Sequence, residues 1–278
     1  MNGTFIDLFA GCGGLSLGLG RAGLECLFGV ETNPDAFATY EYNLLKKQPK
    51  RHTWPTWLER RAWRAEDLLN SHTQRLLHLR GSVDLIAGGP PCQGFSSNGL
   101  RRPDDPRSML IETYLTFINL IKPRIVLLEN VVGFCSMKHQ TGFTYDEYAV
   151  AKLQELGYDS WFQIIRSFDW GVPQSRPRFL LIAAQSGALA GIDPIQRLRV
   201  ARRGFLQRRN LNLSGTSARD AICDLEEAGD LPLDYEWGHL AAFMHRSQIM
   251  GAFCRIGGFF EKPAQGDPPR RFSAAEMV

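Results

Sequence analysis

Short apolar runs alternate with longer amphipathic segments along residues 1–185. The runs have the length of buried strands and the segments the length of helices, an alternation typical of a doubly wound α/β sheet. The pattern weakens from about residue 186, where arginines dominate. We therefore expect a large α/β domain over residues 1–185 and a smaller, irregular region over residues 186–278. The expected strands are Thr4–Leu8, Cys26–Val30, a weak strand before Asp67, Val83–Ala87, Ile125–Leu128, Trp161–Arg166 and Phe179–Ala184.

Helix signals fill the intervals between these strands. Leucines at positions 15, 17 and 19 predict a helix that ends at Gly23. Asn33 suits an N-cap and Pro34 a first helical residue, so a second helix should run to about Lys46. Another helix is expected from about Ser108 to Ile121.

The last two predicted strands should run in opposite directions. Only about a dozen residues join them. A parallel crossover needs about that many as a minimum and usually contains a helix. Gly171, Pro173 and Pro177 forbid a helix here. The sequence therefore predicts a mostly parallel sheet with an antiparallel seventh strand.

Composition is that of an ordinary globular protein. Of the 278 residues, 44% are hydrophobic and 22% are charged, which is enough to bury a core and argues against disorder. No apolar run approaches the roughly 18 residues of a membrane span, and the N-terminus shows no signal peptide. None of the six cysteines stands in a C-x2-C pair. We therefore expect no metal site, reduced thiols, no membrane partner and a cytoplasmic, intracellular protein.

Positive charge is concentrated in one stretch. The net charge is only +3, but several arginines fall together with no acidic residue among them. Such a segment suits contact with phosphates, and it suits the solvated face of a helix equally well. The arginines are Arg197, Arg199, Arg202, Arg203, Arg208 and Arg209.

Unusual residues follow the predicted strands at their carboxyl ends, where open α/β sheets bind ligands. The first strand leads into the glycine-rich turn Phe9-Ala10-Gly11-Cys12-Gly13-Gly14, and the second ends at Glu31. A carboxylate about 20 residues after such glycines can accept ribose hydroxyls. The sequence lacks the phosphate-binding pattern G-x-x-x-x-G-K-[ST], so an adenosyl cofactor without a long phosphate tail fits better. The later strands are followed by Asp67, by Pro90-Pro91-Cys92 and by Glu129-Asn130.

Cys92 is the sharpest candidate for chemistry. A lone cysteine is more often a small buried residue, but this one lies between rigid prolines and a glycine, beyond a strand end, as a nucleophile would. Glu129 directly follows an apolar strand, and an acid at that place is a functional candidate. Arg176 and Arg178 stand at i and i+2 of an extended segment. Both side chains then point the same way and form an anion or carbonyl clamp, unless both are simply solvated.

These residues, in this order, resemble the cytosine-C5 DNA methyltransferase family over roughly residues 4–185. The matching segments are Asp7-Leu8-Phe9-Ala10-Gly11-Cys12-Gly13-Gly14, Glu31, Asp67, Pro90-Pro91-Cys92-Gln93, Glu129-Asn130-Val131 and Gln174-Ser175-Arg176-Pro177-Arg178. The resemblance implies the Rossmann-like fold of S-adenosylmethionine-dependent methyltransferases, with residues 1–185 as the cofactor-binding and catalytic domain. It implies methyl transfer to C5 of a flipped-out cytosine in double-stranded DNA. It also implies a restriction-modification system, with a cognate restriction endonuclease as a genetic partner.

The resemblance further implies a role for each matching position. Cys92 would add to C6 of cytosine, and Glu129 would protonate N3. Arg178 would hold the base carbonyl, and Arg176 would support the loop of the nucleophile. Glu31 would bind the ribose and Asp67 the adenine amino group. The residues implied to line the cofactor pocket are Phe9, Ala10, Gly11, Gly13, Gly14, Glu31, Asp67, Pro90 and Leu110.

The C-terminal part departs from the family pattern. Residues 215–225 resemble the segment that leads into the target-recognition region, and residues 269–276 loosely resemble the penultimate motif, but the final motif does not follow. We therefore expect residues 186–278 to be a partial, truncated recognition region, with weak activity of the chain alone. Two rival interpretations stay open. One is a transfer-RNA cytosine-5 methyltransferase of the same ancestry, and the other is a catalytically inactive DNA-binding regulator with the same fold.

Overall fold

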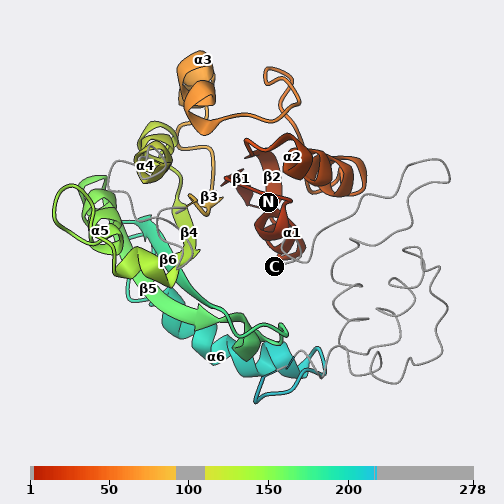
Figure 1. Cartoon of the computed structure of the whole chain (residues 1–278), viewed down its shortest axis with the longest axis vertical. Helices are drawn as coiled ribbons and strands as arrows, with labels where there is room; N and C mark the ends of the chain where they lie inside the picture. Colours follow the sequence, from red (N-terminus) through yellow and green to blue (C-terminus); the bar gives the residue numbers. More distant parts are fainter. Residues whose placement is uncertain (1–2, 92–109, 216, 218–278) are drawn as a thin grey trace. The chain divides into compact units, whose positions relative to one another are not determined.

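The computed structural model describes residues 3–91, 110–215 and 217. Contacts divide the chain into two compact units, whose elements are labelled in Figure 1. The first unit comprises Met1–Ser167 and Arg176–Arg203, and the second comprises Phe168–Ser175 and Gly204–Val278. The sheet with its predicted ligand edge belongs to the first unit.

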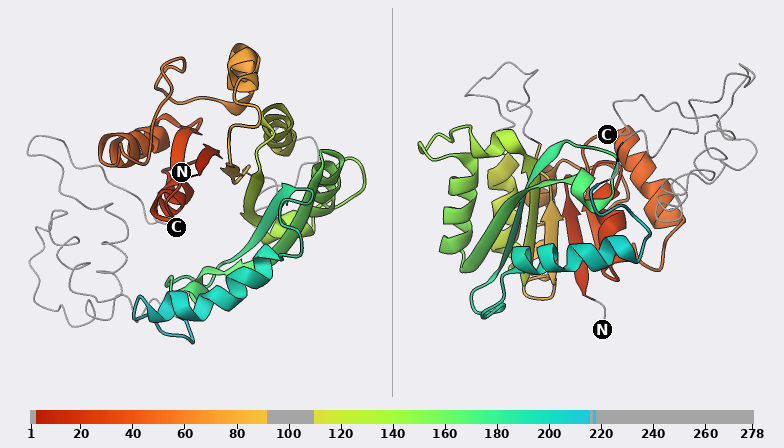
Figure 2. Two further views of the ribbon diagram at one scale, coloured as in Figure 1. Left: turned by 180° about the vertical axis from the view of Figure 1, so that it is seen from behind. Right: turned by 90° about the horizontal axis from the view of Figure 1, so that it is seen from below.

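In its described residues, the first unit is built around a six-stranded sheet of order β2-β1-β3-β4-β6-β5. Its strands stand side by side in the right-hand view of Figure 2. They are β1 (Thr4–Leu8), β2 (Glu25–Val30), β3 (Leu85–Gly88), β4 (Ile125–Val131), β5 (Tyr158–Arg166) and β6 (Pro177–Gln185). β1 to β4 pair in parallel, whereas β6 is antiparallel to both of its neighbours, β4 and β5. The predicted late antiparallel strand is therefore confirmed, and it lies inside the sheet.

Helices connect these strands as the periodicity predicts. The α-helices of the described residues are α1 (Gly14–Arg21), α2 (Pro34–Tyr40), α3 (Ala65–Leu77), α4 (Leu110–Ile121), α5 (Tyr145–Glu155) and α6 (Pro194–Gln207). Asn33 caps α2, because its side-chain oxygen accepts the N–H groups of Asp35 and Ala36. The helix continues to Lys46, as predicted, but its second half is a π-helix, η1 (Glu41–Lys46). Short 3-10 turns follow β4 and β5 as η3 (Val132–Cys135) and η4 (Ser167–Trp170).

The weak strand predicted before Asp67 is wrong. The described chain between η1 and α3 is irregular there, and Asp67 lies in the first turn of α3. Tryptophans of this segment pack on separate partners: Trp54 lies 5.5 Å from the ring of Phe37, and Trp57 lies 5.9 Å from that of Phe28. The apolar residues of the segment serve as individual anchors and lack the strict alternation of a half-buried strand.

Both faces of the sheet are covered, because alternate strand residues join two buried clusters. Phe5 and Leu85 belong to a smaller cluster that packs against Leu15 of α1. Ile6 and Ile86 belong to a larger cluster with residues of α3, α4 and α5. The doubly wound arrangement predicted from the sequence is therefore confirmed.

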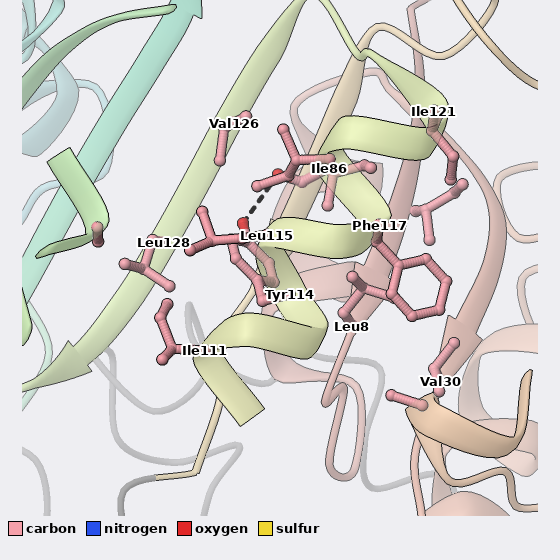
Figure 3. Close-up of a cluster of buried hydrophobic side chains, with 14 of the residues drawn as sticks. Leu8, Val30, Ile86, Ile111, Tyr114, Leu115, Phe117, Ile121, Val126 and Leu128 are labelled. Atoms are coloured by element: carbon pink, nitrogen blue, oxygen red, sulfur yellow. Dashed lines mark hydrogen bonds between the residues drawn. The ribbon is translucent and has the colours of Figure 1, made fainter. Parts of the chain in front are cut away.

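α4 packs along the face of the sheet that carries the larger cluster (Figure 3). The buried Tyr114 hydroxyl donates to the carbonyl of Leu127 at 3.0 Å and lies 3.3 Å from that of Ile86. At Gly88 a Cβ atom would lie 2.6 Å from the Leu8 carbonyl oxygen and 2.8 Å from the Tyr114 ring. A side chain has no room there, so β1, β3 and α4 approach closely just before the predicted ligand edge.

The described part of the second unit is small. The rings of Trp170 and Phe205 are 6.0 Å apart, and the Arg209 guanidinium lies 3.9 Å from the Phe205 ring. Gly171 has φ 84°, and a Cβ atom there would lie 2.5 Å from Leu211. Across both units, none of the helices in the described ranges is long and apolar enough to cross a membrane.

Candidate functional site

The glycine-rich turn joins the carboxyl end of β1 to α1. Phe9, Gly11 and Gly13 all have positive φ, at 61°, 56° and 92°. The turn is fixed by hydrogen bonds from the Ala10 N–H to the Val30 carbonyl and from the Gly13 N–H to the Ala10 carbonyl, both 2.9 Å. Gly13 is the N-cap of α1 and supplies no side chain to satisfy the first N–H groups of that helix. The turn therefore presents backbone donors at the sheet edge, where they attract an electronegative ligand group.

Glu31 lies against this turn. One carboxylate oxygen accepts the Gly11 N–H at 2.8 Å, and the other accepts the Asn33 N–H at 2.7 Å. The carboxylate thus links the turn after β1 to the start of α2. Each oxygen keeps a further lone pair for a ligand hydroxyl.

The segment before α3 reaches the same end of the sheet. The backbone N–H of Trp63 donates to the Glu31 carbonyl at 2.8 Å. Asp67 follows four residues later, with an exposed side chain in the first turn of α3. The segment that contains Asp67 therefore reaches the end of β2 through this hydrogen bond, and not through the strand that was predicted before Asp67.

Glu129 and Arg178 form an ion pair near the carboxyl end of β4. The Arg178 Nε lies 2.7 Å from a carboxylate oxygen of Glu129, and their side chains are 20% and 39% exposed. The pair forms because the antiparallel register of β4 and β6 sets Val131 opposite Arg178. Burial raises the pKa of Glu129 above its usual value, while Arg178 and then Arg176 oppose the rise. A carboxyl with these properties can hold a proton and donate it to a base nitrogen.

Asn130 connects this pair to the loop after β3. It is 4% exposed, and its amide nitrogen donates to the Pro90 carbonyl at 3.1 Å. Its amide oxygen accepts the Val131 N–H at 2.8 Å. A Cβ atom at Gly89 would lie 3.1 Å from the second oxygen of Glu129. The backbone at Gly89 and Pro90 is therefore held directly beside the Glu129 carboxyl, a contact that only the three-dimensional pairing of β3 and β4 reveals.

Cys92 lies outside the described residues, two positions after Pro90. Leu110 begins α4 and is half-buried. Burial raises the pKa of Cys26 and of Cys135 to about 12, which makes both thiols poor nucleophiles near neutral pH. In the described ranges, no group of three His, Cys, Asp or Glu side chains is placed to hold a metal ion.

The arginine-rich stretch lies in and just after α6. Arg199 donates from Nε to the Gln163 side chain of β5 at 2.7 Å, and Arg209 stacks on Phe205. Arg197 and Arg203 are exposed. Part of the stretch is thus used for packing, and both interpretations made from the sequence stay open.

Comparison with known proteins finds a matching family model and relatives that are named type II methyltransferases. The family model of the C-5 cytosine-specific DNA methylase matches residues 3–227. The chain is 34% identical over 183 residues to the type II methyltransferase M.DdeI of Desulfomicrobium norvegicum, covering 66% of this chain and 41% of the relative. It is 33% identical over 253 residues to M.XorII of Xanthomonas oryzae pv. oryzae, covering 90% and 53%. The chain spans about half the length of the curated relatives that it matches.

Among solved structures, the S. pombe Dnmt2 methyltransferase has a TM-score of 0.52 and 19% identity. The match covers 85% of this chain and 61% of that one. At this identity the likeness concerns the fold alone, and it agrees with the sheet described above.

Proposed function

The chain belongs to the C-5 cytosine-specific DNA methylase family, and from this premise we propose that it transfers a methyl group from S-adenosylmethionine to C5 of cytosine in duplex DNA. The observation that carries the proposal is the Glu129–Arg178 pair, held by Asn130 and Gly89 beside the loop that leads to Cys92. This reaction needs an acid, a cation and a thiol; the structure describes the first two together, and the sequence supplies the thiol two positions after Pro90.

Cytosine C5 is a weak nucleophile, so the ring must first be activated. In the proposed mechanism the Cys92 thiolate bonds to C6 while the Glu129 carboxyl gives its proton to N3. The electrons of the C5–C6 double bond then reside in an enamine whose C5 attacks the electrophilic methyl. The C5 proton then passes to solvent water, the C6–S bond breaks to release the Cys92 thiolate, and N3 returns its proton to the Glu129 carboxylate, which restores the aromatic ring. Arg178 holds the base carbonyl, and Arg176 adds positive charge beside the carboxyl.

The target atom is stacked inside the duplex, so the base must leave the stack to reach Cys92. Double-stranded DNA is accordingly the proposed partner. The exposed arginines Arg197 and Arg203 of α6 suit its phosphates. A cognate restriction endonuclease is proposed only as a genetic partner, on the analogy of the type II relatives.

The glycine-rich turn fits S-adenosylmethionine, which when bound supplies the electrophilic methyl sulfonium. A Cβ atom at Gly11 or Gly14 would meet no described atom within 4 Å, so the backbone of the turn is open to a ligand. We assign Glu31 to the ribose hydroxyls and Asp67 to the adenine amino group. The remaining lining residues are Phe9, Ala10, Gly13, Pro90 and Leu110.

Removal of the Glu31 carboxylate should weaken cofactor binding. A hydrogen bond to a charged group contributes roughly 1.5–3 kcal/mol, and every 1.4 kcal/mol is about tenfold in affinity. Glu31→Ala should therefore lower affinity for S-adenosylmethionine by about 10- to 100-fold in calorimetry. The matched control is Glu25→Ala, because Glu25 lies at the start of β2 and Glu31 directly follows its end. This variant should bind S-adenosylmethionine with wild-type affinity. If the Glu31 and Glu25 variants bind S-adenosylmethionine equally well, Glu31 does not belong to the cofactor pocket.

DNA is favoured over transfer RNA because relatives at 33–34% identity are named type II methyltransferases. The test is transfer of labelled methyl from S-adenosylmethionine to matched samples of duplex DNA and transfer RNA. We expect 5-methylcytosine in the DNA alone. Labelled transfer RNA with unlabelled DNA would establish the rival substrate. Because weak activity is expected of this chain, the inactive regulator would be favoured only by cofactor binding without methyl transfer to either substrate in a single-turnover reaction with excess protein.

A further inference from the structure

A carboxyl group is buried directly beneath the proposed cofactor turn. Asp7 belongs to β1 and is 1% exposed. Its Oδ2 accepts the Ser16 hydroxyl at 2.6 Å. Its Oδ1 is buried and has no hydrogen-bond partner among the described residues. The proposed mechanism assigns no role to Asp7. The sequence of the apolar run Thr4–Leu8 does not reveal that Asp7 is hydrogen-bonded to Ser16.

The groups around Asp7 come from each element packed on that face of β1. Besides Ser16 of α1, they are the Cys26 thiol of β2, the Tyr40 hydroxyl of α2 and the Glu31 carboxylate beyond β2. The buried Tyr114 hydroxyl of α4 also interacts electrostatically with Asp7. Cys26 Sγ and the Tyr40 hydroxyl are 3.3 Å apart. His52 Nε2 lies 3.2 Å from the Ser16 carbonyl oxygen. In the part of the chain that the structure describes, no lysine or arginine pairs with Asp7.

This cluster supports the turn from below. Ser16 is the third residue of α1, whose N-cap is Gly13 of the turn. A Cβ atom at Gly13 would lie 2.9 Å from the Tyr40 ring, and one at Gly29 would lie 2.6 Å from it. Tyr40, Ser16 and Asp7 are thus packed between the turn, the start of α1 and the end of β2.

An ionised carboxylate is costly in such a place, because it would be buried with Ser16 as its one hydrogen-bonding residue among the described residues and with no counter-ion there. Burial raises the pKa of Asp7 to about 7. The hydrogen bonds from the Ser16 hydroxyl and from the Ser16 backbone N–H oppose the rise in pKa, and the nearby Glu31 charge adds to it. The neutral acid accepts the Ser16 hydroxyl through one oxygen and carries its proton on the other.

We propose that Asp7 is a positioning residue that, as a neutral acid bonded to Ser16, holds the glycine-rich turn in its binding conformation, and that its ionisation weakens cofactor binding. The proposal rests on the cofactor site proposed above. The sign of the effect follows from the raised pKa of Asp7: its proton is lost as pH rises through about 7. If only the neutral form binds well, affinity is constant at lower pH and falls by up to about tenfold per pH unit above pH 7.

The same proton affects stability. The ordinary pKa of an aspartate is 3.8, so between about pH 4 and pH 7 the folded chain binds a proton that the unfolded chain has released. The contribution of Asp7 to the free energy of unfolding therefore decreases as pH rises through this interval and is level above it. His52 has the opposite effect on stability: burial lowers its pKa below 6.5, so its contribution to the free energy of unfolding increases as pH rises towards that value.

The test is calorimetric binding of S-adenosylhomocysteine, the product form of the cofactor, to the full chain from pH 6 to pH 9. The wild type should lose affinity above about pH 7. Asp7→Asn cannot ionise and should lack this loss, while any titration of the ligand or of His52 persists. Ser16→Ala removes the hydroxyl that stabilises the carboxylate, so the loss should begin at higher pH.

Three results would overturn the proposal: a wild-type affinity that is independent of pH, the same pH dependence in Asp7→Asn, or an unmoved midpoint in Ser16→Ala. If Asp7→Asn does not fold, the proposal is still tested by Ser16→Ala, in which the pH midpoint of the affinity loss must move to higher pH. Absence of binding at every pH in the wild type would instead count against the proposed cofactor site itself, which keeps the two failures separate.

Discussion

Replacement of Cys92 by alanine is expected to abolish covalent capture of duplex DNA that contains 5-fluorocytosine, and turnover with it. Fluorine cannot leave C5 as a proton does, so the adduct formed between the thiolate and C6 accumulates after methyl transfer. A free thiol with a pKa near 8.5 is only about 3% ionised at pH 7, so the site must activate it. The measurement is a shifted protein band that survives denaturation. S-adenosylmethionine affinity should be nearly unchanged.

Cys135→Ala provides the matched control for this experiment. The pKa of that thiol is raised to about 12 by burial, so it should not act as a nucleophile, and its replacement should leave capture intact. A covalent complex that survives in Cys92→Ala would eliminate Cys92 as the nucleophile. Loss of capture in both variants would point to a structural effect of removing either thiol.

Glu129→Gln is expected to lower the single-turnover methylation rate by about 10²- to 10⁴-fold, the usual contribution of a positioned general acid. Glutamine keeps the shape of the side chain but cannot give a proton to N3. It also removes the charge that pairs with Arg178 at 2.7 Å. Glu155→Gln is the control, because Glu155 pairs with Lys152 on the surface of α5, and exposed pairs contribute little.

The pH dependence gives a second readout on Glu129. Burial raises its pKa above the usual value, and only the protonated form can donate. The wild-type rate should therefore decline as pH rises through this raised pKa, and the decline should be missing from Glu129→Gln. A variant that retains nearly the full wild-type rate would show that protonation of N3 comes from another group.

Much of the sheet could be predicted from the sequence, because its signals are local. β1 matches the prediction at both ends, and the short, proline-containing connection before β6 was sufficient to predict its direction. Reliance on local signals also explains why a strand was wrongly predicted before Asp67. Tryptophans that anchor an irregular segment on Phe28 and Phe37 have no pattern that distinguishes them from a weak strand.

Contacts between distant segments could be predicted in type but not in detail. The sequence nominates Glu129 and Arg178 separately, but only the register of β4 against β6 pairs them. Asn130 illustrates the same limit, since its partner Pro90 is 40 positions away. Asp7 was part of a recognised motif, yet its burial beside Ser16, Cys26 and Tyr40 depends on how three elements converge. The roles assigned to Cys92 and to the cofactor-lining residues stay predictions.

The position of β6 also constrains how the site is assembled during folding. β6 is the last strand of the described residues, yet it lies between β4 and β5. Before β6 is added, both of those strands present unpaired backbone edges, which are prone to pair with other chains. Arg178 reaches Glu129 only when β6 enters. The ion pair at the centre of the proposed chemistry therefore requires that β6 pair with β4, so a nascent chain that ends before β6 cannot hold the acid and its cation together.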